Sequence, residues 1–262
     1  MSVAARRLAR IAPLALLLTL AAGVMFSAKL PPAHLDPRLA FASPSASHPF
    51  GCGEGGVDLL SYVAFGIARG TALAVSVAVV GFVVGSPLGA IAAVRRGTLE
   101  RVVERTCDLL QGFPSFLLAL SVLSVVRVPT RVHLALVFSI TAWAPFARLA
   151  LAQVRVLREA QFVEAARALG QGAFTILWVH ILPQLLGIVA VQLGSTASAV
   201  VVSEAGLAFV GFGTADGVSL GSVLDQGVSV MLRAPHVLWV GSLSVFLTSV
   251  ALISAGRAAK SA

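Results

Sequence analysis

The stretch TALAVSVAVVGFVVGSPLGAIAAV, residues 71–94, contains no charged side chain and ends at the pair Arg95 and Arg96. A helix needs about 20 mainly apolar residues to cross the hydrocarbon core of a bilayer. Membrane helices tolerate an internal proline such as Pro87, because neighbouring helices and hydroxyl side chains satisfy the freed backbone groups. The stretch therefore predicts a membrane-spanning helix, and it sets the fold class for the rest of the chain.

Five further apolar stretches follow the same rule. They lie at residues 11–28, 113–126, 132–152, 176–202 and 236–255. The stretch at 113–126 is short for a span, so we expect it to extend into neighbouring residues. The first stretch follows a cluster of arginines and fits either a cleaved signal peptide or a retained helix, and its length favours the retained helix. The sequence therefore predicts an all-α polytopic membrane protein with about six transmembrane helices.

The composition supports this prediction. Hydrophobic residues make up 58% of the 262 residues and charged residues 11%, whereas about 25% of the residues of a soluble domain are charged. So few charges cannot cover the surface of a water-soluble enzyme. The net charge of +8 raises the question of nucleic acid, but the basic residues sit beside apolar segments rather than in a patch with aromatics. We therefore expect membrane lipid, and no nucleic acid, as a partner.

The charges also predict the topology. Most of the 19 basic residues lie in the N-terminus, the connections after the second and fourth spans, and the C-terminus. The positive-inside rule then places both termini in the cytoplasm. The predicted organisation is a cytoplasmic tail with the first transmembrane helix at 1–28, an extracytoplasmic loop at 29–66, a transmembrane core at 67–256 and a cytoplasmic tail at 257–262. Cys52 and Cys107 fall on opposite sides of the membrane, so we expect no disulfide between them.

The connection between the fourth and fifth predicted spans is unusually long and charged. Residues 161–169 are good helix formers, and Gly170 follows where a C-terminal cap is expected. The pattern predicts a short amphipathic helix, a turn, and a second helix that runs into the next span. Its apolar residues recur at helical spacing: Phe162, Ala165, Ala166 and Leu169. Two interpretations stay open, a helix that fills a groove on another protein and a helix that lies on the lipid surface.

This connection resembles the cytoplasmic loop of ABC-importer permeases of the binding-protein-dependent type. The resemblance rests on Glu164-Ala165-Ala166, then three residues and Gly170, then nine residues and His180-Ile181-Leu182-Pro183. The last four residues are similar to the dipeptide, oligopeptide and nickel branch. The resemblance implies a type I ABC-importer permease fold, in which these residues form an ATPase-coupling loop that sits in a cleft of the ATP-binding subunit.

The resemblance also implies a role for each matched residue. Glu164 would cap or pair with basic groups near the ATPase cleft. Ala165 and Ala166 would keep the helix surface small enough to enter that cleft. Gly170 would permit a tight turn, and Pro183 would start or bend the next helix.

Two other segments resemble the same branch. One is the run from His48 to Gly51 followed by residues 56–61, and the other is residues 204–213. The branch has an acidic residue where this chain has Gly53 and a basic residue where it has Val57. The resemblance spans about residues 30–255, with a divergent outer loop and C-terminal tail.

The sequence places the energy source on another chain. A phosphate-binding loop needs a lysine after a glycine, and the lysines of this chain, Lys29 and Lys260, follow other residues. We therefore expect the protein not to be an enzyme, with ATP hydrolysis on a separate ATPase subunit. An intramembrane protease would need Ser195 near His180, but these lie on one predicted helix about 22 Å apart.

The predicted spans carry amides and hydroxyls rather than clear mid-membrane charges. Gln192, Ser195 and Ser198 lie near one face of the fifth span, and we expect them to line a polar translocation pathway. The alternative is hydrogen bonding between helices. A secondary transporter would more often bury ionisable residues in its spans.

The resemblance implies a permease subunit in the inner membrane that forms half of a translocation pathway. Its partners would be a second homologous permease subunit, two cytoplasmic ATP-binding subunits and an extracytoplasmic solute-binding protein. The implied solute is a di- or oligopeptide, with nickel or another small solute as the alternative, and no cofactor or metal is expected in this chain. The alternative function is a secondary transporter or another multi-pass protein without an ATPase partner.

Overall fold

The computed structural model describes residues 3–27, 35–214 and 217–260, and its regular elements are helices apart from an isolated bridge between Cys52 and Asp58. The longer helices are α1 (Val3–Ser27), α2 (Leu59–Arg95), α3 (Gly97–Gly112), α4 (Ser115–Leu123), α5 (Arg131–Leu157), α6 (Gln161–Ala168), α8 (Leu182–Phe209), α9 (Leu220–Ser229) and α10 (Pro235–Lys260). Short helical segments are η1 (Pro37–Leu39), η2 (Glu54–Gly56), α7 (Ala173–Thr175) and the π-helix η3 (Ile176–Ile181). The all-α prediction is confirmed.

Four helices in the described part of the chain are long and apolar enough to cross a membrane. They are Leu59–Arg95, Arg131–Leu157, Ala173–Phe209 and Pro235–Ala258, and the bent pair α3–α4 gives a fifth. The apolar part of α1 is shorter, Ile11–Phe26, at the place of the predicted first span. The polytopic architecture is therefore as predicted. Residue 28 of the predicted first helix, residues 29–34 of the predicted outer loop and residues 261–262 of the tail lie outside the described residues.

The third predicted span, at residues 113–126, does extend into neighbouring residues as expected, but it is not one straight helix. The chain instead forms α3 and α4, which meet at an angle of 74° across Phe113 and Pro114. The residue before a proline avoids the helical region, and Phe113 is accordingly extended, with φ −97° and ψ 129°. The bend and the full length of this span were not predicted, because α3 is amphipathic and a search for apolar runs does not find it.

Small residues bring the long helices together. A Cβ at Gly85 would overlap the carbonyl of Trp143, and one at Gly89 would overlap the carbonyl of Ala147, so α2 packs backbone to backbone on α5. On the other side of the bundle, Gly194 of α8 meets Gly256 of α10. Close approach at glycines is how membrane helices gain packing contacts where the hydrophobic effect is weak.

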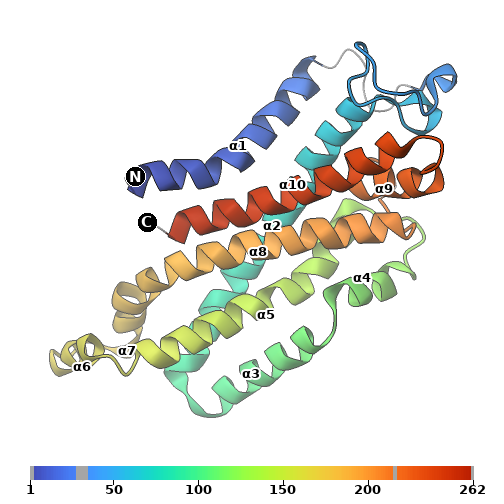
Figure 1. The fold of residues 1–262 in the computed structure, drawn as a ribbon. Helices are drawn as coiled ribbons and strands as arrows, with labels where there is room; N and C mark the ends of the chain where they lie inside the picture. Colours follow the sequence, from blue (N-terminus) through green and yellow to red (C-terminus); the bar gives the residue numbers. More distant parts are fainter. Residues whose placement is uncertain (1–2, 28–34, 215–216, 261–262) are drawn as a thin grey trace.

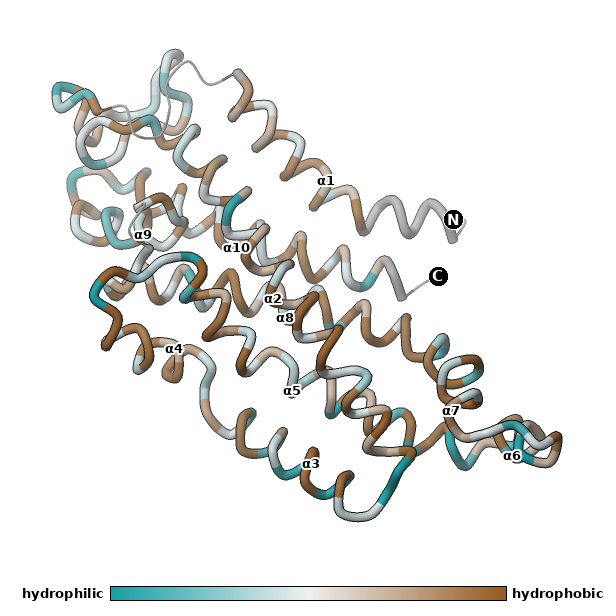
Figure 2. The backbone as a smooth tube through the Cα atoms, turned by 180° about the vertical axis from the view of Figure 1, so that it is seen from behind, coloured by the Kyte–Doolittle hydropathy of each residue, from teal (hydrophilic) through white to brown (hydrophobic). Residues whose placement is uncertain are grey.

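The bundle has two distinct ends (Figure 1). One carries α6, the start of α8, the end of α5, the start of α3, the beginning of α1 and the end of α10, and we call it the α6 end. The other carries α9 and residues 35–58, and we call it the α9 end. Figure 2 shows hydrophobic residues along the long helices and hydrophilic residues gathered near the ends.

The α9 end contains a helix that the sequence did not predict. Helix α9 packs on α8 and α10, and a Cβ at Gly221 would overlap the carbonyl of Ala205. Gly221 is therefore required by a close helix crossing. Cys52 lies at this end and Cys107 lies in α3, both buried with free thiols, so the prediction of no disulfide between them holds.

Candidate functional site

The predicted helix and turn of the charged connection are both present. Backbone hydrogen bonds cap the C-terminus of helix α6. Gly170 N donates to Arg167 O at 2.9 Å, and Gln171 N donates to Ala166 O at 3.0 Å. Gly170 has φ +82°, a conformation that favours glycine because it has no Cβ. The Gly170 turn therefore sends the chain back toward the fifth span.

Helix α6 has two different apolar faces. Val163 and Ala166 are buried, at 1% and 6% exposure, in the same core cluster as Ile176 and Ile181. Phe162, Ala165 and Leu169 face outward, and Leu169 is 82% exposed. Residues three and four apart share a helix face, which is why the predicted stripe divides.

The expectation for Ala166 is corrected by this geometry. Its small side chain does not lie on the free surface of α6. It lets α6 pack closely on the base of the fifth span. Ala165 stays on the outward face, as does Glu164, which is exposed and makes no ion pair with another described residue.

The second half of the loop is tied to the first. His180 Nε2 donates to Gln171 Oε1 at 2.9 Å, which links the Gly170 turn to η3. Ile181 is buried in the core and Leu182 begins α8. Pro183 lies in the first turn of α8, directly after the π-helix η3. Helix α6 is therefore connected to α8 through the Gly170 turn and η3.

An ionic network that the sequence analysis missed holds the same end together. Arg155 donates to Glu100 Oε1 at 2.6 Å and, with both terminal nitrogens, to Glu104 at 3.0 and 2.8 Å. Arg158 donates to Ala93 O at 2.6 Å, and Arg96 lies 2.8 Å from Glu159. Hydrogen bonds between an ionised donor and an ionised acceptor are stronger than those between neutral groups. The network joins the ends of α2, α3 and α5 beside α6.

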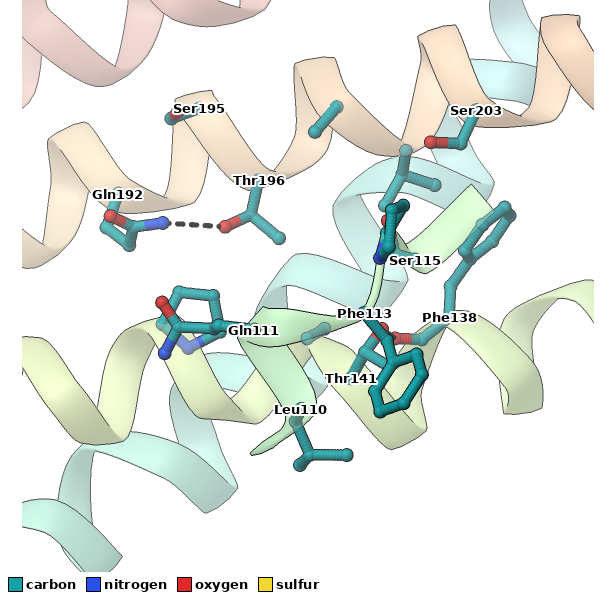
Figure 3. A pocket seen from close by; sticks show the side chains of 15 residues that line it. Leu110, Gln111, Phe113, Ser115, Phe138, Thr141, Gln192, Ser195, Thr196 and Ser203 are labelled. Atoms are coloured by element: carbon teal, nitrogen blue, oxygen red, sulfur yellow. Dashed lines mark hydrogen bonds between the residues drawn. The ribbon is translucent and has the colours of Figure 1, made fainter. Parts of the chain in front are cut away.

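A cavity of about 360 Å³ lies between the α3–α4 break, α5 and α8 (Figure 3). Its lining combines uncharged polar and apolar side chains: Leu110, Gln111, Phe113, Pro114, Ser115, Phe138, Thr141, Ala142, Pro145, Gln192, Ser195, Thr196, Ala199, Val200 and Ser203. Residues on both sides of the break at Pro114 line the cavity, so the bend of the third span forms part of its wall.

The structure brings two of the three predicted pathway residues to this cavity. Gln192 and Ser195 line it, but Ser198 is buried at 6% exposure and lies outside the lining. Six residues correspond to about 600° of rotation on a helix, so Ser198 points about 120° away from Gln192. Ser203 lies on the cavity face and was not predicted, although the same spacing argument finds it.

At the α9 end, the outer loop folds back on the first turn of α2. His48 Nδ1 lies 3.0 Å from Asp58 Oδ1, and Asp58 Oδ2 accepts the Ser61 N–H at 2.9 Å, capping α2. Gln226 Oε1 of α9 accepts the Glu54 N–H at 3.1 Å. A Cβ at Gly53 would lie 2.9 Å from Gln226 Oε1. The backbone of Gly53 therefore packs closely on Gln226, at the position where the resembling branch has an acidic residue.

The structure is that of a polytopic membrane protein with an exposed apolar helix face at the α6 end and a cavity lined partly by polar side chains. Residues 85–257 match the family described as binding-protein-dependent transport system inner membrane component, and the chain belongs to this family. It is the permease subunit of an ABC importer of the dipeptide/oligopeptide branch, placed in the inner membrane. ATP hydrolysis is carried out by a separate ATPase subunit, and a solute-binding partner completes the system.

Several curated relatives are similar to this chain in sequence. The chain is 33% identical over 211 residues to the glutathione transport system permease protein GsiD of Pectobacterium atrosepticum, which covers 79% of this chain and 69% of the relative. The proteins of the same name from Shigella dysenteriae and Escherichia coli O157:H7 give the same identity and coverage.

Proposed function

We propose that this chain forms half of the translocation pathway for short peptides, including peptides of the size of glutathione. The other half would come from a second homologous permease. Two ATP-binding subunits would dock at the α6 end and a solute-binding protein at the α9 end. Both termini and α6 would lie in the cytoplasm, and residues 67–256 would form the transmembrane core.

The observation that carries the proposal is the outward apolar face of α6. Phe162, Ala165 and Leu169 are exposed while the opposite face of the same short helix is fixed to the protein. A helix face with this spacing fits a hydrophobic groove on a partner. The arginines of the ionic network lie at the same end, and positive residues flank spans on the cytoplasmic side. The exposed apolar face supports docking on a partner, and the arginines support a cytoplasmic position for this end.

The mechanism follows from how α6 is attached. ATP binding brings the two ATPase subunits together and moves the grooves that hold the two α6 helices. Val163 and Ala166 would move the base of the fifth span along with α6. The His180–Gln171 hydrogen bond would limit bending at the Gly170 turn during this movement. Helix α8 then shifts as a unit, and the cavity changes the side on which it opens.

The lining of the cavity supports a peptide as the solute. Amide and hydroxyl groups lie beside Phe113 and Phe138, which suits a chain of peptide bonds with apolar side chains. Nickel prefers imidazole and other strong ligands, and the lining residues are of other types. The relatives described as glutathione transport permeases agree with a short peptide.

A co-purification experiment tests the proposal. The tagged permease would be isolated with its partners from cells, and ATP-driven uptake of a labelled peptide would be measured in proteoliposomes. Leu169→Glu should remove the ATPase and abolish uptake, whereas Leu232→Glu, at a 97% exposed residue of the α9 end, should retain the ATPase. Full peptide uptake without any ATPase would show a secondary transporter instead.

A further inference from the structure

The cavity contains two primary amides that come from different helices. Gln111 ends α3 beside the break, and Gln192 lies on α8. Figure 3 shows both side chains directed into the same space, with Thr196 next to Gln192. A primary amide carries both hydrogen-bond donors and an acceptor, and this is the same pair of functions that a peptide bond presents.

The orientation of Gln192 is fixed by its own helix. Gln192 Nε2 donates to Thr196 Oγ1 at 3.1 Å, one turn further along α8. This hydrogen bond uses one of the two N–H donors of the Gln192 amide, and it leaves Oε1 of this cavity-lining residue able to accept a hydrogen bond. Gln111 has no hydrogen bond to another described residue, so its amide remains available to a solute.

Helix α5 contributes a proline to the same cavity. Pro145 has no N–H, so the carbonyl of Thr141 lacks the hydrogen bond that residue 145 would normally donate to it. Thr141 and Pro145 both line the cavity. The apolar side is formed by Phe113 and Phe138, which leaves room for side chains of different size.

We infer that this permease binds the substrate itself, through a neutral subsite for one peptide bond: Gln192 Oε1 accepts the peptide N–H, and Gln111 donates to the peptide carbonyl. Thr196 is a positioning residue that sets the direction of the Gln192 amide. The inference rests on the proposed function, because it assumes that peptides pass through the cavity. It adds that the permease, and not only the solute-binding protein, selects for an amide backbone.

The test compares a labelled peptide with its depsipeptide analogue, in which an ester oxygen replaces one N–H. Uptake by the complete complex is measured in proteoliposomes with the same binding protein throughout, so the preference of that protein cancels between permease variants. Gln192→Leu should lower the ratio of peptide to depsipeptide kcat/KM about fivefold, the usual worth of one hydrogen bond. Thr196→Val should lower it less, and Thr196→Ser should restore it.

Two variants separate this role from simple loss of packing. Gln111→Leu should raise KM for both solutes equally, because the ester keeps its carbonyl. Ser198→Ala, on the same helix but outside the cavity, should change neither the ratio nor KM. An unchanged ratio in an active Gln192→Leu complex, or an equal change in Ser198→Ala, would overturn the inference while leaving peptide transport intact. Absence of peptide uptake by the wild-type complex would overturn the proposed function, and this inference with it.

Discussion

The two ends of this molecule are held together by different forces. At the α6 end, arginine and glutamate pairs from α2, α3 and α5 fix the helix ends, and α6 presents an apolar face outward. At the α9 end, the loop at 35–58 is fixed mainly by backbone hydrogen bonds and tight glycine contacts. The α6 end combines paired charges at its base with an exposed apolar face, which is the arrangement that the proposed ATPase docking requires. The other end is closed on itself by short local contacts.

The largest expected effect comes from the outward face of α6. Leu169→Glu places a charge where the ATPase groove would close, and a central apolar contact of an interface contributes about 3 kcal/mol. We expect about a hundredfold weaker ATPase binding, measured by titrating purified ATPase onto the permease in detergent. Val163→Ala at the inner face should weaken coupling but not docking, and equal losses of docking in both variants would erase the distinction between the two faces.

The next effect concerns the ionic network. Arg155→Ala leaves Glu104 and the buried Glu100 without their main partner, and hydrogen bonds to charged groups contribute about 2 kcal/mol. We expect a loss of stability of that size in denaturation of the purified permease. Arg155→Lys should recover part of it, since it keeps the charge but loses the bidentate geometry. An Arg155→Ala protein of unchanged stability would show that charge pairing does not hold this end.

A smaller effect is expected at the cap of α2. Asp58→Ala removes the acceptor for the Ser61 N–H and the partner of His48, and loss of a cap costs about 1 kcal/mol. Asp58→Asn should be milder, because asparagine also caps helices well. Binding of the ATPase should be unchanged in both variants. Weaker ATPase binding would mean that the two ends are not independent.

The smallest effect concerns the thiol at the α9 end. Burial raises the pKa of Cys52, and the nearby carboxylates of Asp58 and Asp36 raise it further. The thiolate is the reactive form, so at pH 7.5 Cys52 should react more slowly with a soluble maleimide than free cysteine does. The rate should climb as pH rises toward the raised pKa. Asp58→Asn should speed the reaction, and rapid labelling of the folded wild-type protein would contradict the closed loop.

The sequence predicted those parts of the fold that depend on nearby residues. Helix α6 and the Gly170 turn follow from local helix formers and one glycine, and the long spans follow from continuous apolar runs. The break at Pro114 was missed because α3 carries charges that pair only with distant α5. Helix α9 was not predicted because its ten residues are too few for a span. The contact that requires Gly221 is with Ala205 of α8, which is distant in the sequence.

The sites show the same division. Helix α6 and its turn could be predicted from residue spacing, but Ala165 and Ala166 look alike in sequence while the first is exposed and the second buried. Helical spacing predicted that Gln192, Ser195 and Ser198 share one face. Gln192 and Ser195 line the cavity, whereas Ser198 lies outside its lining. Helical spacing could not predict Gln111, because this residue lines the cavity next to a 74° bend that the sequence did not indicate.

The most direct test of the central claim is site-specific photocrosslinking in the assembled complex. A photoreactive amino acid would be placed at Leu169 on the outward face of α6 and, in a separate protein, at Leu232 of the α9 end. The account predicts a crosslink from position 169 to the ATP-binding subunit and none to that subunit from position 232. A crosslink to the ATP-binding subunit from position 232, or none from position 169 in an active complex, would contradict it.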